Sequence, residues 1–185
     1  RTNYPDGYFD VAIGNVPFGD YRVNDSVYNS HGFLIHDYFF AKTLDKLRAG
    51  GVAAYITTKG TMDKESTKVR EFLFKKAELL GAIRLPNTAF KNAGTKVTAD
   101  ILFLQKREKE IENPEWIAVT EDAQGFRINS YFVQHPEMIL GTMQEISGPY
   151  GMETTCVEKE GVPLGERLRA AISHITGHIP ERVEE

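Results

Sequence analysis

Short apolar runs alternate with amphipathic stretches along the first part of the chain. Four runs are apolar enough to form buried strands, and they lie at residues 9–13, 52–57, 79–85 and 97–106. Residues 32–49 and 64–77, which lie between these runs, repeat apolar side chains every three to four positions, as helices with one buried face do. Strands that alternate with helices predict an α/β fold.

The junctions between these elements carry further predictions. A loop without helical pattern, residues 87–96, joins the last two runs, so we expect them to pair as antiparallel strands. Asp100 is an unusual residue for the second of these strands. Gly50–Gly51 follows the first helical stretch and predicts its C-terminal cap. Asp63 or Thr61 is expected to cap the second helix.

The rest of the chain is less regular. A charged hinge ends at Pro114, and it predicts a boundary between a unit of residues 1–110 and an extension of residues 111–185. The extension is expected to hold a hairpin around 121–125, a helical segment at 130–135 capped by Asn129, a short helix at 136–141, a turn at 147–151, a strand at 152–157 and an amphipathic helix at 164–175.

Composition limits the range of functions. Lys and Arg number 22 against 26 Asp and Glu, and the resulting net charge of −4 counts against a chain that grips a DNA duplex alone. The single cysteine, Cys156, excludes an intramolecular disulfide and fits a reducing, cytoplasmic compartment. No apolar run approaches the length of a membrane span, and no His/Cys cluster suggests a metal site. The polar start lacks Met, so we expect a piece of a longer protein.

The residues that follow the first apolar run suggest a binding pocket. Ligands of open α/β sheets bind at the carboxyl ends of strands, and Asn15 lies at such an end. Pro17 favours an extended Val16, which fixes the direction of the Val16 carbonyl. The Asn15 side chain and this carbonyl can accept both hydrogens of an exocyclic amino group. Phe18 offers a face for a planar base, worth roughly 1–3 kcal/mol. The alternative is an ordinary turn after a strand.

Asn15-Val16-Pro17-Phe18 resembles the Asn-Pro-Pro-Phe/Tyr motif of S-adenosylmethionine-dependent amino-group methyltransferases, in particular the adenine-N6 DNA methyltransferases. Val16 replaces the first Pro of that motif but keeps the backbone acceptor. The order of elements over about residues 8 to 107 also follows that family. Several further passages resemble the helicase-linked DNA methylases of phage and conjugative elements: 36–40, 82–86, 93–95 with Asp100, 129–132, 135–138 and 140–141.

The resemblance implies the C-terminal half of a Rossmann-like methyltransferase sheet, mostly parallel with an antiparallel last strand, plus a small α+β extension. The family's Gly-rich cofactor loop is not visible in this sequence. We therefore expect an upstream half, in cis or as a separate chain, to be needed for activity. The implied cofactor is S-adenosylmethionine, and the implied partners are DNA, this upstream half and a helicase segment.

Four further residues have candidate roles at this stage. His36 and Asp37 could contact the cofactor together with Asn15, and the alternative for this pair is an ordinary helix surface. Lys59 and Lys64 could reach DNA phosphates, and the alternative is a solvated face.

Two other functions remain open. The motif also fits methylation of glutamine nitrogen in proteins, although Phe18 instead of Tyr favours adenine. A non-catalytic fragment that supplies only DNA contacts or an assembly surface would fit the absent Gly-rich loop and the negative charge. Cys156 is expected to be a packed thiol rather than a nucleophile.

Overall fold

The computed structural model describes residues 4–17 and 19–183. A four-stranded sheet forms its centre, in the order β1-β2-β4-β3. The strands are β1 (Phe9–Asn15), β2 (Leu47–Thr58), β3 (Ala77–Leu85) and β4 (Ala99–Lys106). β1 and β2 are parallel, whereas β4 lies antiparallel between β2 and β3. The expected α/β fold and the antiparallel pairing of the last two strands are therefore confirmed.

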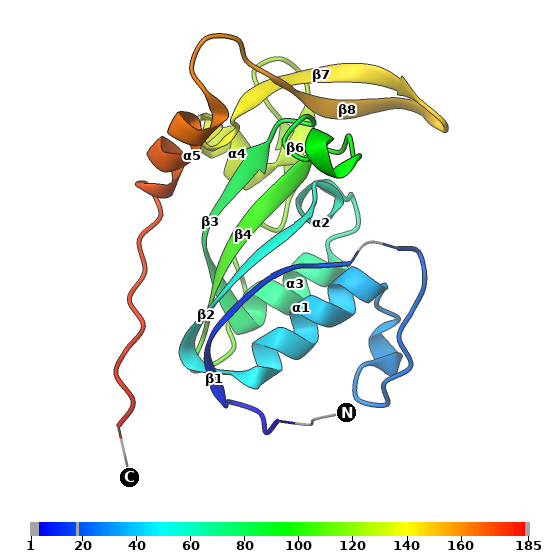
Figure 1. Ribbon diagram of the computed structural model, residues 1–185. Helices are drawn as coiled ribbons and strands as arrows, with labels where there is room; N and C mark the ends of the chain where they lie inside the picture. Colours follow the sequence, from blue (N-terminus) through cyan, green and yellow to red (C-terminus); the bar gives the residue numbers. More distant parts are fainter. Residues whose placement is uncertain (1–3, 18, 184–185) are drawn as a thin grey trace.

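Helices cover one face of this sheet (Figure 1). They are α1 (Ile35–Lys46), α2 (Gly60–Asp63) and α3 (Lys68–Lys76), and α1 packs beside α3. The apolar side chains that repeat along α1 and α3 meet those of β2 and β4 in a buried core. Its fully buried members include Phe40, Leu44, Leu73, Phe74, Leu102 and Leu104. Burial of these side chains holds the helices against the sheet.

The later part of the chain adds smaller elements at the carboxyl ends of β1, β2 and β3 (Figure 1). They are β5 (Val119–Glu121), β6 (Arg127–Asn129), α4 (Ser130–Gln134), β7 (Gly141–Gly148), β8 (Gly151–Glu158) and α5 (Leu164–Ile172). Three short 3-10 turns are η1 (Asn29–His31), η2 (Lys91–Ala93) and η3 (Pro136–Met138). Asn129 caps α4 as expected, because its side chain accepts a 2.9 Å hydrogen bond from the Tyr131 amide.

Residues of this later part share the core of the sheet. Phe132, Met138 and Cys156 are buried in the same cluster as Leu102 and Leu104. Burial raises the pKa of the Cys156 thiol to about 12, which fits a packed thiol. The expected boundary near residue 110 stays a prediction. Among the described residues, no helix is both long and apolar enough to cross a membrane.

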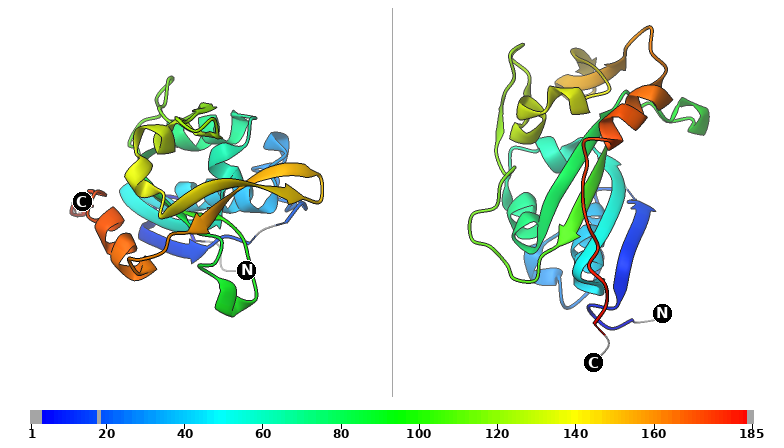
Figure 2. Two further views of the ribbon diagram at one scale, coloured as in Figure 1. Left: turned by 90° about the horizontal axis from the view of Figure 1, so that it is seen from above. Right: turned by 90° about the vertical axis from the view of Figure 1, so that its left-hand side faces the viewer.

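Among the described residues, the only helix on the second face of the sheet is the short α5 at its end, and an extended segment after α5 runs along this face (Figures 1 and 2). Gln105 donates a 2.7 Å hydrogen bond to the His178 carbonyl, and Arg182 lies 3.2 Å from Asp10 of β1. At the β1 edge this face is exposed: 80% of Ile13 is accessible to solvent.

Two sequence predictions about helix ends are wrong. α1 ends at Lys46, and Gly50–Gly51 lies inside β2 instead of capping the helix. A Cβ on Gly51 would lie 3.0 Å from the Asp10 carbonyl oxygen, so glycine there permits close approach of β1.

The second helix, expected over residues 64–77, begins later than predicted, because α3 starts at Lys68 and α2 ends at Asp63. Asp63 does not cap α3; its carboxylate instead binds Arg84 and the Asn129 amide, at 2.7 and 3.0 Å. The competing long-range contact thus outweighs the local capping signal.

Candidate functional site

Asn15 ends β1 at the carboxyl-end edge of the sheet. It lies opposite Ile56 of β2, and the Val16 amide donates a 3.0 Å hydrogen bond to the Ile56 carbonyl. This bond extends the strand pairing one residue past β1 and fixes the backbone that carries the motif. Val16 is buried, at 3% exposed, whereas Asn15 and Pro17 are exposed. Phe18 lies outside the described residues.

The Asn15 side chain lines a cleft of about 110 Å³, called here the Asn15 cleft. Its other walls are mostly apolar and come from β2, β4 and the β3–β4 loop: Ile56, Phe90, Ala93, Thr95, Val97 and Ala99. One amide group in an apolar cleft is suited to a flat ligand that presents a polar group at one edge.

Phe90 lines this cleft, but the sequence did not predict it as a site residue. It comes from the loop between β3 and β4, far from Asn15 in sequence, and it is half-buried. The available signal was a lone aromatic in a loop at the carboxyl end of a predicted strand. That signal alone does not say which cavity the ring faces.

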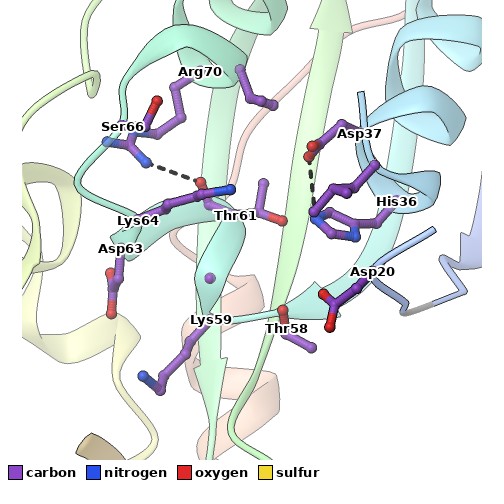
Figure 3. A pocket seen from close by; sticks show the side chains of 13 residues that line it. Asp20, His36, Asp37, Thr58, Lys59, Thr61, Asp63, Lys64, Ser66 and Arg70 are labelled. Carbon is purple, nitrogen blue, oxygen red and sulfur yellow. Dashed lines mark hydrogen bonds and ion pairs between the residues drawn. The ribbon is translucent and has the colours of Figure 1, made fainter. Parts of the chain in front are cut away.

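The four other candidate residues share a second cavity, of about 350 Å³, called here the charged pocket (Figure 3). His36 and Asp37 enter it from the first turn of α1, and Lys59 and Lys64 from either side of α2. His36 Nε2 lies 3.3 Å from Asp37 Oδ1. Burial raises the pKa of the Asp37 carboxyl, although His36 and Lys64 oppose this effect.

Arg70 lines the same pocket, but its hydrogen bonds connect separate parts of the fold. It is 1% exposed, and its Nε donates a 2.8 Å hydrogen bond to the Ile117 carbonyl. Its Nη1 donates a second bond, of 3.2 Å, to the Thr61 carbonyl (Figure 3). Arg70 thus ties α2 and α3 to the segment before β5, and this positions the backbone between Lys59 and Lys64.

The structure therefore brings His36, Asp37, Lys59 and Lys64 together and places Asn15 in a neighbouring cavity. Both cavities lie at the carboxyl ends of strands, where the sequence predicted a site. The sequence did not predict that they would be separate.

A buried ion network supports this edge of the sheet. Arg84 of β3 is fully buried, and its Nε and Nη2 each donate a 2.8 Å hydrogen bond to Asp100 of β4. Its Nη1 donates to Asp63 at 2.7 Å, and its guanidinium lies 4.4 Å from the ring centre of Phe132. Burial by itself would lower the pKa of Arg84, but the two carboxylates raise it above its ordinary value, so Arg84 stays charged.

Comparison with known proteins identifies the family. The model of the N-6 DNA methylase family matches residues 3–145, which is most of the chain. The chain belongs to the N-6 DNA methylase family. Asn15 and both cavities lie within the matched part of the chain.

One relative is a much longer protein. The Defense against restriction protein B of Escherichia phage P1 is 34% identical to this chain over 111 residues. The match covers 58% of this chain but 5% of the phage protein, so the chain spans only a small part of that relative.

Solved structures resemble this chain over part of its length. The M protein of the type I restriction enzyme EcoKI matches at 21% identity and a TM-score of 0.45, over 60% of this chain and 24% of its own. A Listeria monocytogenes protein, described as a class I S-adenosylmethionine-dependent methyltransferase, matches at 24% identity and a TM-score of 0.46. That match covers 63% of this chain and 38% of the other. Likeness at this level says nothing about what this chain binds.

Proposed function

We propose that this chain supplies the amino-group-binding part of an adenine-N6 DNA methyltransferase. The observation that carries the proposal is the place of Asn15, at the end of β1 and in the wall of an apolar cleft beside Phe90. Membership of the N-6 DNA methylase family supports adenine in DNA as the substrate. An adenine removed from the helix would present its flat ring to the apolar walls and its amino group to Asn15.

The role of Asn15 and Val16 follows from the chemistry of the amino group. The lone pair of adenine N6 is delocalised into the ring, so the nitrogen is a poor nucleophile. The Asn15 amide oxygen and the Val16 carbonyl would accept its two hydrogens and favour a tetrahedral nitrogen. The same two oxygens would stabilise the positive charge that develops on the nitrogen during the reaction. Phe90 would stack on the adenine ring, the role that the sequence suggested for Phe18.

The described residues of this chain do not by themselves enclose a site for S-adenosylmethionine. Asn15 lies in a different cavity from His36 and Asp37, and its own cleft, of about 110 Å³, is too small to hold both a base and a nucleoside cofactor. The cofactor, when bound, supplies a methyl group activated on a sulfonium. We propose that Asn15 contacts it across the open side of β1, and that His36 and Asp37 reach it from α1.

The open side of β1 supports an upstream half of the domain as the missing partner. In the part of the chain that the structure describes, β1 pairs with β2 along one edge only, and Val11 and Ile13 are 46% and 80% exposed. A groove of about 290 Å³ runs beside it, between Phe9 of β1 and Phe39 of α1. Further strands and helices, in cis or from a separate chain, would cover these apolar surfaces. Lys59 and Lys64 are the proposed DNA contacts, and a helicase segment is a further proposed partner.

The cofactor prediction follows from this open edge. Titration calorimetry of residues 1–185 with S-adenosylmethionine should show no micromolar binding. The intact protein, meaning this chain together with the proposed upstream half, should bind it. Micromolar binding by residues 1–185 alone would show that no upstream half is needed.

A second prediction concerns Phe90. Phe90→Leu keeps an apolar wall but removes the flat face, so KM for DNA should rise by about 10-fold or more, as expected for loss of base stacking. Phe90→Tyr should behave nearly as the wild type. Equal KM values for the Leu variant and the wild type in a methyl-transfer assay would remove Phe90 from the binding site.

The proposed function is tested by the fate of the methyl group. The intact protein is incubated with S-adenosylmethionine labelled in the methyl group, duplex DNA and a protein extract. We expect the label in DNA. Label in protein alone would favour glutamine methylation, and no label in either would favour a non-catalytic role.

A further inference from the structure

A third cavity, of about 300 Å³, lies between the Asn15 cleft and the charged pocket. It shares Thr58, Lys59 and Gly60 with the charged pocket, and it shares Val97 with the Asn15 cleft. The three cavities therefore adjoin one another along the carboxyl-end edge of the sheet. We call the middle one the Lys59–Lys96 cavity, after the two cations that line it.

The β7–β8 ribbon forms one wall of the Lys59–Lys96 cavity. This ribbon crosses the carboxyl-end edge of the sheet (Figures 1 and 2), and Ile146, Glu153 and Thr154 contribute to the lining. The ribbon is fastened where it passes the sheet: the Cys156 amide donates a 2.9 Å hydrogen bond to Thr98 Oγ1.

A second set of bonds holds the same part of the ribbon. The backbone amide of Asn87 donates a 2.7 Å hydrogen bond to the Cys156 carbonyl, and its side-chain Nδ2 donates a 3.0 Å hydrogen bond to Thr155 Oγ1. Lys59 Nζ donates a 3.2 Å bond to Thr154 Oγ1 across the cavity. The ribbon is therefore held against the sheet at residues 154–156, and Lys59 is already directed along this wall.

The charges in this cavity favour an anion. Lys59 and Lys96 are its cationic lining residues, and Glu153 is its carboxylate, among the described residues. Lys96 is exposed, so a ligand can reach it without a change in the fold. Thr58 is partly exposed in the same lining and has a hydroxyl that can donate to an anion.

We propose that the Lys59–Lys96 cavity binds a backbone phosphate of the DNA strand whose base enters the Asn15 cleft. The inference rests on the proposed function and adds a residue, Lys96, and a role for the β7–β8 ribbon. A base and its flanking phosphates are joined through one sugar, so a base in the Asn15 cleft brings a phosphate to an adjoining cavity. The adjoining Lys59–Lys96 cavity is cationic, whereas the walls of the cleft itself are uncharged.

The carboxylate of Glu153 gives the proposal a second consequence. It lies on the ribbon wall of the same cavity and would repel the phosphate. Neutralising Lys96 should therefore weaken DNA binding, and neutralising Glu153 should strengthen it. A purely structural role for the two residues would not produce opposite effects.

The test measures how DNA binding by the intact protein depends on salt. Fluorescence anisotropy with a labelled duplex of mixed sequence gives log K against log salt concentration, and Lys96→Gln should reduce the slope by about 0.9, the value for one phosphate contact. Lys91→Gln is the matched control: Lys91 is an exposed lysine of the same loop that does not line the cavity, and the slope should not change. Glu153→Gln should bind more tightly than the wild type.

The outcomes of this experiment distinguish failure of the phosphate site from failure of the proposed function. If the wild type binds DNA and Lys96→Gln keeps the wild-type slope, or Lys91→Gln reduces it equally, the phosphate site is refuted and the proposed function stands. If the wild-type protein binds no DNA at any salt concentration, both claims are refuted.

Discussion

Replacing Asn15 by Ala is expected to slow methyl transfer to DNA by about 10²–10³-fold or more, the usual cost of removing one preorganised group that stabilises transition-state charge. The variant loses the amide oxygen that would accept a hydrogen of the amino group, and the Val16 carbonyl cannot replace it alone. The measurement is the single-turnover rate of the intact protein with DNA in excess of its dissociation constant. A rate within a few-fold of the wild type would remove Asn15 from the reaction.

The same substitution should leave the fold unchanged. Asn15 is exposed, and its side chain forms no hydrogen bond with any residue in the described part of the chain. Asn92→Ala is the matched control, because Asn92 is an exposed residue beside the Asn15 cleft that does not line it. It should keep the wild-type rate, and both variants should unfold at the wild-type urea concentration.

Replacing Asp100 by Asn is expected to lower the free energy of unfolding by about 3–5 kcal/mol, the cost of breaking a buried ion pair from one side. Asn keeps one oxygen but directs an NH₂ group at the Arg84 guanidinium, which Asp100 now meets with two 2.8 Å bonds. Arg84, which is fully buried, would then keep its bond to Asp63 and at most one of its two bonds to residue 100. Urea unfolding followed by the fluorescence of Trp116 measures the change.

An exposed pair provides the control for this prediction. Arg127 forms two bonds to Glu65, of 2.7 and 3.0 Å, and both residues are exposed. Glu65→Gln should leave stability almost unchanged, because exposed pairs contribute little. Equal stability of Asp100→Asn and the wild type would show that the Arg84 network does not support the sheet.

The alternation of apolar runs and amphipathic stretches was sufficient to predict the sheet and the two main helices, because local periodicity reflects which face is buried. It did not predict β7. Gly141–Gly148 is a mixed polar strand whose partner, β8, lies beyond a turn, and much of the ribbon is exposed to solvent on both faces. β7 therefore lacks most of the period that burial imposes, whereas the strand predicted at 152–157 is confirmed as β8.

Long-range partners explain the remaining differences. Asp100 looked unusual in an apolar strand, and only the register of β3 with β4 places Arg84 opposite it. Asp63 lies where the sequence predicts a helix cap, but its carboxylate accepts a hydrogen bond from Arg84 instead. Phe90 joins Asn15 only because the β3–β4 loop folds back over the edge of the sheet. Sequence spacing contains none of this information.

The central claim is that the Asn15 cleft presents an adenine amino group for methylation. The most direct measurement is mass spectrometry of nucleosides from DNA treated with the intact protein and S-adenosylmethionine. The account predicts N6-methyldeoxyadenosine with the wild type and none above background with Asn15→Ala. Methylated cytosine in place of adenine, or equal N6-methyldeoxyadenosine with both proteins, would contradict it.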